Sequence, residues 1–156
     1  MNYTELLTPE MQQTLQAAGY ETPTPIQEQS LETLLGGRDL IGIAQTGTGK
    51  TAAFAVPIIE KINPENRKPQ ALILCPTREL ALQTTAVFKK LSPHKKMRTV
   101  SIYGGQSPNV QIQALRGGAQ VVVGTPGRVK DLIGQNALKL NNIRFVVLDE
   151  ADEMLD

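Results

Sequence analysis

Five short apolar runs, separated by longer amphipathic segments, dominate the pattern of this 156-residue chain. The runs are 39–44, 71–75, 99–103, 121–124 and 145–149. Strands that are buried on both faces read as continuous apolar runs, and intervening helices allow such strands to run parallel. The pattern therefore predicts an α/β fold in which a parallel β-sheet is sandwiched by helices.

Four of the predicted helices begin with a hydroxyl residue followed by proline. These pairs are Thr8-Pro9, Thr24-Pro25, Ser107-Pro108 and Thr125-Pro126. The hydroxyl can accept a hydrogen bond from a free amide of the first turn, and proline fits the first helical position because its missing N–H is not needed there. Gly19, Gly36 and Gly134 predict helix ends, and Pro57 predicts a kink or an end in the helix after Lys50.

The composition limits the classes of partner and compartment. Sixteen basic and fifteen acidic residues give a net charge of +1, so any contact with nucleic acid has to be local. The single Cys75 excludes an internal disulfide and fits a buried small residue in a reducing compartment. Because no run approaches the roughly 18–20 apolar residues of a membrane span and no signal-peptide pattern is present, we expect a cytoplasmic protein without membrane contact.

A glycine-rich segment follows the first predicted strand and precedes a predicted helix. Main-chain amides and the positive end of the helix dipole bind phosphate at such a turn. We expect Lys50 to approach the outer phosphates and the Thr51 hydroxyl to approach Mg²⁺, whereas a purely structural glycine turn is the alternative. The residues expected to bind nucleotide here are Thr46, Gly47, Thr48, Gly49, Lys50 and Thr51.

Asp149 ends the last apolar run and is followed by Glu150. The carboxyl ends of parallel strands meet at one edge of a sheet, so Asp149 should emerge at the same edge as Lys50. We expect Asp149 and Thr51 to hold Mg²⁺ largely through water, and Glu150 to orient or deprotonate an attacking water. Lys50, Asp149 and Glu150 are the predicted catalytic residues. The acidic first turn of a solvated helix is the alternative for the acidic pair.

Asp149-Glu150-Ala151-Asp152 is similar to the signature of the DEAD-box ATP-dependent RNA helicases. Further segments resemble that family's motifs in family order: Gly19-Tyr20, 23–27, 44–51, 76–81, Gly104-Gly105 and 125–128. The resemblance covers essentially the whole chain. It implies a RecA-like P-loop NTPase fold that is incomplete at its C-terminal end, with residues 1–156 as the N-terminal helicase domain and 1–37 as its helical adenine-recognition region.

The resemblance assigns Gln27 and Tyr20 to adenine recognition. An amide side chain offers both a donor and an acceptor, as the adenine edge requires. Tyr20 is similar to the aromatic residue that packs on the base. The residues themselves leave alternatives, because 24–27 reads as a capping box whose glutamine reaches back to the cap amide, and Tyr20 can be an ordinary core residue.

Three further motifs lie where predicted strands give way to helices. We expect their amides, hydroxyls and guanidinium groups to bind an RNA backbone independently of sequence and without a preference for DNA. The expected RNA-binding residues are Pro76, Thr77, Arg78, Gly104, Gly105, Thr125, Pro126, Gly127 and Arg128. An exposed or ion-paired surface arginine is the alternative for Arg78 and for Arg128. The resemblance assigns Asp152 to coupling between domains.

The function implied by the resemblance is ATP hydrolysis coupled to sequence-independent RNA binding and local duplex unwinding. Helicases of this family use two RecA-like domains, and neither the second domain nor the Ser-Ala-Thr motif occurs in the 156 residues. We therefore expect the chain by itself to bind nucleotide weakly and to be nearly inactive. Two alternatives stay open: a nucleotide- or RNA-binding module without turnover, and a folding or assembly fragment.

The family fold also raises a question about the sheet. In that fold the strand bearing Ser-Ala-Thr lies between the phosphate-loop strand and the strand ending at Asp149. A gap there would leave two apolar strand edges with unpaired amides and carbonyls. Three solutions are possible: a longer protein or complex, a strand supplied by another chain, or direct closure of the two strands.

Overall fold

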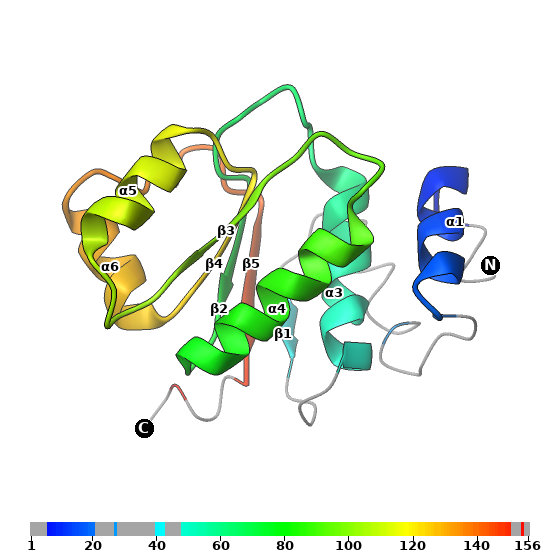
Figure 1. Ribbon diagram of the computed structural model, residues 1–156, viewed down its shortest axis with the longest axis horizontal. Helices are drawn as coiled ribbons and strands as arrows, with labels where there is room; N and C mark the ends of the chain where they lie inside the picture. The colour runs from blue at the N-terminus through cyan, green and yellow to red at the C-terminus, as the bar shows by residue number, and fades with distance from the viewer. Residues whose placement is uncertain (1–5, 21–26, 28–39, 43–47, 151–153, 155–156) are drawn as a thin grey trace.

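All five predicted strands form one parallel sheet. The computed structural model of the chain describes residues 6–20, 27, 40–42, 48–150 and 154. Its strands are β1 (Leu40–Gly42), β2 (Ala71–Leu74), β3 (Thr99–Ile102), β4 (Val121–Gly124) and β5 (Phe145–Asp149). They are ordered β1-β5-β2-β4-β3, and every neighbouring pair is parallel (Figure 1). The predicted fold class is confirmed.

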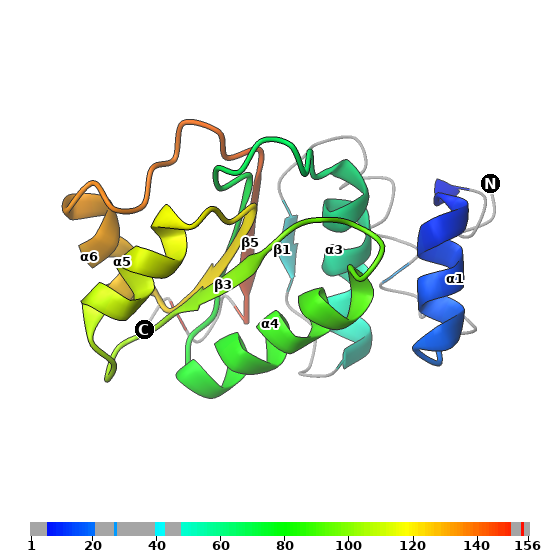
Figure 2. The same cartoon turned by 45° about the horizontal axis from the view of Figure 1, so that its top comes forward.

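Helices cover both faces of this sheet. The described helices are α1 (Pro9–Ala17), α3 (Thr48–Lys61), α4 (Arg78–Leu91), α5 (Pro108–Arg116) and α6 (Pro126–Gly134). Helices α3 and α4 pack on one face, α5 and α6 pack on the other, and α1 lies beyond α3 (Figures 1 and 2). No helix in the described ranges is long and apolar enough to cross a membrane.

The strand pleat divides the apolar side chains between two cores. Ile73, Val123 and Val147 point into the core under α3 and α4. Leu72 and Val122, one residue away, point into the core under α5 and α6. Successive strand side chains alternate between faces, so a sheet covered on both sides needs apolar residues at every position. This requirement explains why β2, β4 and β5 read as apolar runs.

The start and end of α1 follow the predicted signals. The Thr8 hydroxyl accepts a hydrogen bond from the Met11 amide at 3.3 Å, with Pro9 in the first helical position. Gly19 has a φ of +87° just after the helix, and the Tyr20 amide donates to the Leu15 carbonyl at 2.9 Å. These features form a glycine-terminated helix cap.

The predictions at Pro57 and Gly134 have different outcomes: Pro57 does not end its helix, and the kink considered there stays a prediction, whereas Gly134 is the last residue of α6. Helix α3 continues through Pro57 to Lys61 and does not end at the proline. Helix α6 ends at Gly134, as predicted, and the left-handed residue that follows its end is Asn136, with a φ of +59°. Asparagine tolerates this conformation better than most residues, and it here occupies the left-handed position that glycine often takes after a helix. The predicted signals Thr24-Pro25 and Gly36 lie outside the described residues.

The C-terminal end of α3 makes hydrogen bonds with Lys95 and with Thr8. Lys95 Nζ donates to the carbonyl oxygens of Ile59 at 2.6 Å, Glu60 at 3.0 Å and Ile62 at 3.0 Å. The Glu60 carboxylate accepts hydrogen bonds from the Thr8 amide at 2.7 Å and the Thr8 hydroxyl at 3.0 Å. A cation thus satisfies carbonyls at the negative end of α3, and the same turn caps α1.

Strands β1 and β5 are direct neighbours. Leu40 pairs with Val147, and Gly42 pairs with Asp149. Of the three solutions considered for the sheet, the structure shows direct closure of the two strands. The pairing brings the strand that precedes α3 to the strand that ends at Asp149.

Candidate functional site

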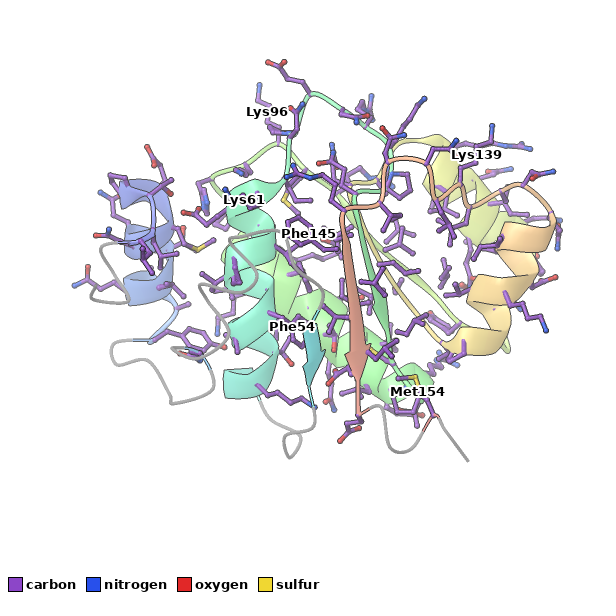
Figure 3. The ribbon with its side chains drawn as sticks, turned by 180° about the vertical axis from the view of Figure 1, so that it is seen from behind. Phe54, Lys61, Lys96, Lys139, Phe145 and Met154 are labelled. Atoms are coloured by element: carbon purple, nitrogen blue, oxygen red, sulfur yellow. The ribbon has the colours of Figure 1, made fainter. Side chains whose placement is uncertain are left out.

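One edge of the sheet carries predicted functional residues. Within the described ranges, those that follow a strand lie beyond its carboxyl end. Figure 3 shows this edge at the bottom, where Met154 follows β5, with Lys96 and Lys139 at the opposite edge. The strand order divides the edge into two halves. The ends of β1 and β5 carry the candidate nucleotide residues, and the ends of β2, β4 and β3 carry the candidate RNA residues.

Lys50 and Asp149 form a buried ion pair in the first half. Lys50 Nζ lies 2.6 Å from Asp149 Oδ1, and their side chains are only 4% and 1% exposed. Helix α3 begins at Thr48, so Lys50 and the buried Thr51 lie in its first turn, at the positive end of the helix dipole. Thr46, Gly47 and the side chain of Thr48 lie outside the described part. The structure therefore joins the predicted phosphate lysine to the predicted magnesium carboxylate.

Glu150 follows Asp149 with an uncommon backbone conformation. Its φ is +52°, in the left-handed region that residues other than glycine seldom occupy, and its side chain is partly exposed. Such conformations cost free energy and concentrate at functional sites. Glu150 thus marks the turn at which β5 ends beside the ion pair, whereas Asp152 lies outside the described residues.

Cys75 is a neighbour of this site that the sequence did not indicate. Its Sγ lies 3.8 Å from Thr84 Oγ1 and 4.0 Å from Asp149 Oδ2. Burial raises the pKa of the Cys75 thiol to about 12, and the nearby Asp149 charge adds to the shift. The thiol is therefore protonated near neutral pH, and its predicted role as a buried small residue is confirmed.

The candidate adenine residues are only partly surrounded by described structure. Gln27 is 3% exposed. Tyr20 is partly buried against the core under α3 and α4, and Lys90 Nζ lies 6.0 Å from the centre of its ring. Residues 21–26 and 28–39 lie outside the described ranges, including the capping threonine Thr24. The packing of Tyr20 therefore fits a core residue and leaves adenine contact a prediction.

The second half of the edge begins with the turn from β2 into α4. Pro76 precedes it, and the Thr77 hydroxyl caps α4 by accepting from the Leu80 amide at 3.1 Å. Arg78 is exposed, and its guanidinium carbon lies 4.9 Å from the centre of the Tyr103 ring. Tyr103 follows β3, so this cation–π contact links the ends of two strands.

Arg128 is held in place by the loop after β3. Its guanidinium donates twice to the Gln106 carbonyl at 3.1 Å and once to Gln111 Oε1 at 3.0 Å. Its Nε also lies 3.9 Å from a carboxylate oxygen of Asp131. The side chain is 12% exposed, so Arg128 is not an exposed surface arginine, whereas its contact with Asp131 fits the ion-paired alternative.

Gln111 organises this half of the edge, and sequence reasoning missed it. Its side chain is 2% exposed, and its Nε2 donates to the Tyr103 carbonyl at 2.9 Å and to Gln106 Oε1 at 2.8 Å. One buried amide thus connects the loop after β3 to Arg128. The available signal was a polar residue on the inward stripe of a helix that also carries Ile112 and Leu115.

The main chain is accessible at three glycines of this half of the edge, and Thr125 lies two residues before one of them. Gly104, Gly105 and Gly127 are exposed, and a methyl group added at any of them would meet no atom within 4 Å. Gly105 has a φ of +84°, which glycine adopts without strain. Thr125 precedes Pro126 at the start of α6 but makes no capping hydrogen bond with its side chain. The structure thus collects the predicted RNA residues along three adjacent strand ends.

Comparisons with known proteins agree with this arrangement. Residues 24–156 match the DEAD/DEAH box helicase family. The chain is 54% identical over 143 residues to the RNA helicase CrhR of Synechocystis, covering 92% of this chain and 29% of CrhR. It is 51% identical over 138 residues to the ATP-dependent RNA helicase DeaD of Haemophilus influenzae, covering 88% of this chain and 22% of DeaD.

A solved structure shows the same fold. A DEAD box protein from the hyperthermophile Methanococcus jannaschii has a TM-score of 0.89 and 42% identity, over 96% of this chain and 41% of that protein. The chain spans less than a third of the length of CrhR and of DeaD. The match of residues 24–156 nevertheless includes most of its own length. The chain belongs to the DEAD/DEAH box helicase family.

Proposed function

We propose that this chain is the ATP-binding, N-terminal RecA-like domain of a DEAD-box RNA helicase, with residues 1–37 forming its adenine-recognition region. In the full-length protein it would couple ATP hydrolysis to sequence-independent RNA binding and local unwinding. The observation that carries the proposal is the ion pair between Lys50 and Asp149, placed at the same sheet edge as Arg78 and Arg128. Relatives named RNA helicases support the choice of nucleic acid.

The donor set at the ion pair fits a magnesium nucleotide. It offers an ammonium group from Lys50, a hydroxyl from Thr51, a carboxylate from Asp149 and the amides at the start of α3. No group of three His, Cys, Asp or Glu residues among the described ones could hold a metal. One carboxylate with phosphate oxygens and water is a common environment for Mg²⁺. Asp149 and Thr51 would hold Mg²⁺ here, and when bound the ion would neutralise phosphate charge.

The protein groups have separate roles in this proposal. Lys50 would contact phosphate oxygens in place of the Asp149 carboxylate, and Asp149 and Thr51 would hold Mg²⁺. Glu150, partly exposed beside Asp149, orients or deprotonates the attacking water. Gln27 and Tyr20 recognise adenine through the amide and the ring face.

RNA contacts belong to the second half of the edge. Arg78 and Arg128 supply guanidinium groups, while the exposed glycines and the start of α6 supply amides. Arg128 is fixed by Gln106 and Gln111 before RNA arrives, which lowers the entropy cost of its contact. These groups recognise the backbone, so binding is independent of base sequence.

A binding module without turnover is the second candidate, and the ion pair bears on the nucleotide affinity of either candidate. In the described state Lys50 and Asp149 neutralise each other, so nucleotide has to compete with an existing contact. We expect weak nucleotide binding and very slow hydrolysis by the chain alone. A second RecA-like domain would add arginine fingers that stabilise charge in the transition state. Such arginines raise the hydrolysis rate by roughly 10³–10⁵.

The test measures magnesium-dependent binding of a fluorescent ATP analogue. Lys50→Ala should abolish saturable binding and Gln27→Ala should weaken it, while excess GTP should not compete. Lys61→Ala, an exposed lysine at the other end of α3, is the matched control and should bind normally. Equal binding by Lys50→Ala and the unchanged chain, with circular dichroism confirming that both are folded, would refute the nucleotide site.

Turnover is tested separately by adding the second RecA-like domain of a relative. RNA-stimulated ATP hydrolysis in that mixture, absent from Glu150→Gln, supports the helicase domain. Saturable ATP binding without RNA-stimulated hydrolysis supports the binding module instead.

A further inference from the structure

Two adjoining hollows lie at the edge of the sheet opposite the candidate ATP and RNA residues. The larger one, of about 730 Å³, is bordered by the loop before β2, the turn after α5 and the loop before β5. The smaller one, of about 390 Å³, is bordered by the loop before β3. Arg67 and Gly118 line both hollows, which are therefore adjacent and are here together called the basic trough. Lys96 and Lys139, on either side of it, are labelled at the top of Figure 3.

The basic trough concentrates positive charge. Six of the sixteen basic residues of the chain line it, but only one of the fifteen acidic residues, Glu65, does so. The six are Arg67, Lys68, Lys96, Arg98, Arg116 and Lys139. The trough therefore carries a formal charge of +5 on a chain whose total is +1. All six basic side chains are exposed, so their charges face solvent.

Two of these arginines are held by the backbone between α5 and β4. The Arg67 guanidinium donates to the Gly117 carbonyl, and Arg98 Nη1 donates to the Gly118 carbonyl at 3.0 Å. Gly118 has a φ of +97°, and a methyl group there would come within 2.7 Å of the Arg67 side chain. The turn therefore approaches the arginines closely and positions them in the trough.

Helix dipoles do not account for this charge. Basic residues gather in the last turns of helices because the C-terminal ends carry partial negative charge. Of the six residues only Arg116 lies in the last turn of a described helix, and the others lie in loops before β2, β3 and β5. Ion pairs do not account for it either, because no salt bridge is found for any of the six within the described part.

We propose that the basic trough is a second RNA-binding surface, which contacts the phosphodiester backbone independently of ATP. Its six cations can neutralise several phosphates, and the amide side chains of Asn66, Asn141 and Asn142 add hydrogen-bond donors. No aromatic residue lines it, so base stacking makes no contribution and RNA of any sequence binds. It lies across the sheet from the predicted RNA residues, so RNA is contacted at both edges.

RNA fits this surface better than an acidic protein. Stable protein interfaces are centred on buried aromatic or large apolar anchors, whereas the trough has no aromatic lining residue and its charges are spread over two adjoining hollows. Spread cations over a concave surface match a flexible chain of phosphates.

The experiment measures binding of single-stranded oligouridylate, without nucleotide, over a range of salt concentrations. Lys68→Gln/Lys139→Gln removes two trough charges, and Lys89→Gln/Lys130→Gln removes two exposed charges that line neither hollow. If each trough lysine neutralises one phosphate, the plot of log K for RNA binding against log salt becomes less steep by about 1.4 in the first pair. The affinity of that pair falls by about 25-fold near 0.1 M salt. The control pair leaves slope and affinity nearly unchanged.

Two further measurements distinguish loss of an RNA contact from loss of folding and from binding of an acidic protein. Thermal melting should give the same midpoint for both pairs, since all four lysines are exposed. Photo-crosslinking with 4-thiouridine RNA should label peptides spanning 64–69 and 137–142. Equal losses in both pairs, no loss in either, or binding of polyglutamate at the trough without RNA crosslinks would overturn the proposal. The ATP-analogue assay is unaffected by the trough variants, so failure here is distinct from failure of the nucleotide site.

Discussion

Lys50 Nζ contacts Asp149 Oδ1 at 2.6 Å in a setting where both side chains are almost fully buried. The two groups come from the first turn of α3 and the last residue of β5, so the ion pair joins a helix start to a strand end. Removing one partner of a buried ion pair costs more free energy than the pair itself does, because the remaining buried charge is then uncompensated. The contact therefore couples the stability of the fold to the residues proposed to bind ATP.

The first prediction is a coupling energy between these two residues. Lys50→Met or Asp149→Asn alone should lower the free energy of unfolding by about 3–5 kcal/mol if the remaining charge stays buried and unpaired. The double variant should lose clearly less than the sum of the two single losses. Urea unfolding of the four proteins measures the coupling. Additive losses would show that the contact contributes nothing to stability.

The second prediction concerns Cys75 at high pH. The pKa of this thiol rises from 9.0 to about 12 in the folded chain. Below pH 9 the thiol is protonated in the folded and unfolded states, and its contribution to stability is fully present. Between pH 9 and 12 only the unfolded state ionises, so this contribution is lost as the pH rises. The difference in unfolding free energy between the unchanged chain and Cys75→Ala should shrink above pH 9 in urea titrations; a constant difference would contradict the shifted pKa.

The third prediction tests Gln111 as a positioning residue for Arg128. Gln111→Leu removes the acceptor of one Arg128 hydrogen bond and the donor to two loop oxygens. We expect a loss of about 1–3 kcal/mol in the free energy of unfolding, since buried polar groups lose their partners. RNA affinity should fall while affinity for the ATP analogue stays the same.

Gln113→Leu is the matched control for that change. It makes the same substitution on the same helix at an exposed position and should alter neither stability nor RNA binding. If Gln113→Leu and Gln111→Leu weaken RNA binding equally, the hydrogen bonds of Gln111 have no special role.

The fourth prediction concerns the lysine at the end of α3. Lys95→Met should lower the free energy of unfolding by about 1 kcal/mol, because three carbonyls lose a charged donor. Lys96→Met, at the exposed neighbouring position, should have little effect.

The pH dependence of Lys95 gives a second readout. Burial lowers the pKa of its ammonium below 10.5, although the charge of Glu60 partly opposes the shift. Between the lowered folded value and 10.5 the unfolded state binds more protons, so stability rises with pH. The advantage of the unchanged chain over Lys95→Met should therefore grow as the pH approaches 10.5. A decrease over that range would reverse the inferred sign.

The sequence predicted the elements of this fold well because their signals are local. The runs 121–124 and 145–149 match β4 and β5 in both bounds. Thr8-Pro9 and Ser107-Pro108 mark helix starts because capping and proline geometry depend on a few adjacent residues. The pairing of β1 with β5 could not be predicted, since an apolar run does not identify its neighbour.

The candidate site was predictable in its charged residues and not in its supporting amides. Lys50 and Asp149 follow from a loop pattern and a strand end, and the structure places them in contact. Gln111 acts through partners in the loop after β3 that only the folded chain defines. A polar residue on the inward stripe of a helix signals that it is buried but does not identify its hydrogen-bond partners.

The place of β1 in the sheet has a consequence for the order of events during synthesis. Within the described sheet β1 pairs only with β5, and the paired residues Leu40 and Val147 are 107 positions apart. Strands β2, β4 and β3 can associate among themselves earlier, because all three precede β5 in the chain. As the polypeptide leaves the ribosome, β1 therefore stays unpaired until β5 has been synthesised. Nascent chains in which β5 has not yet emerged should hold a partly formed sheet that cannot yet bind ATP.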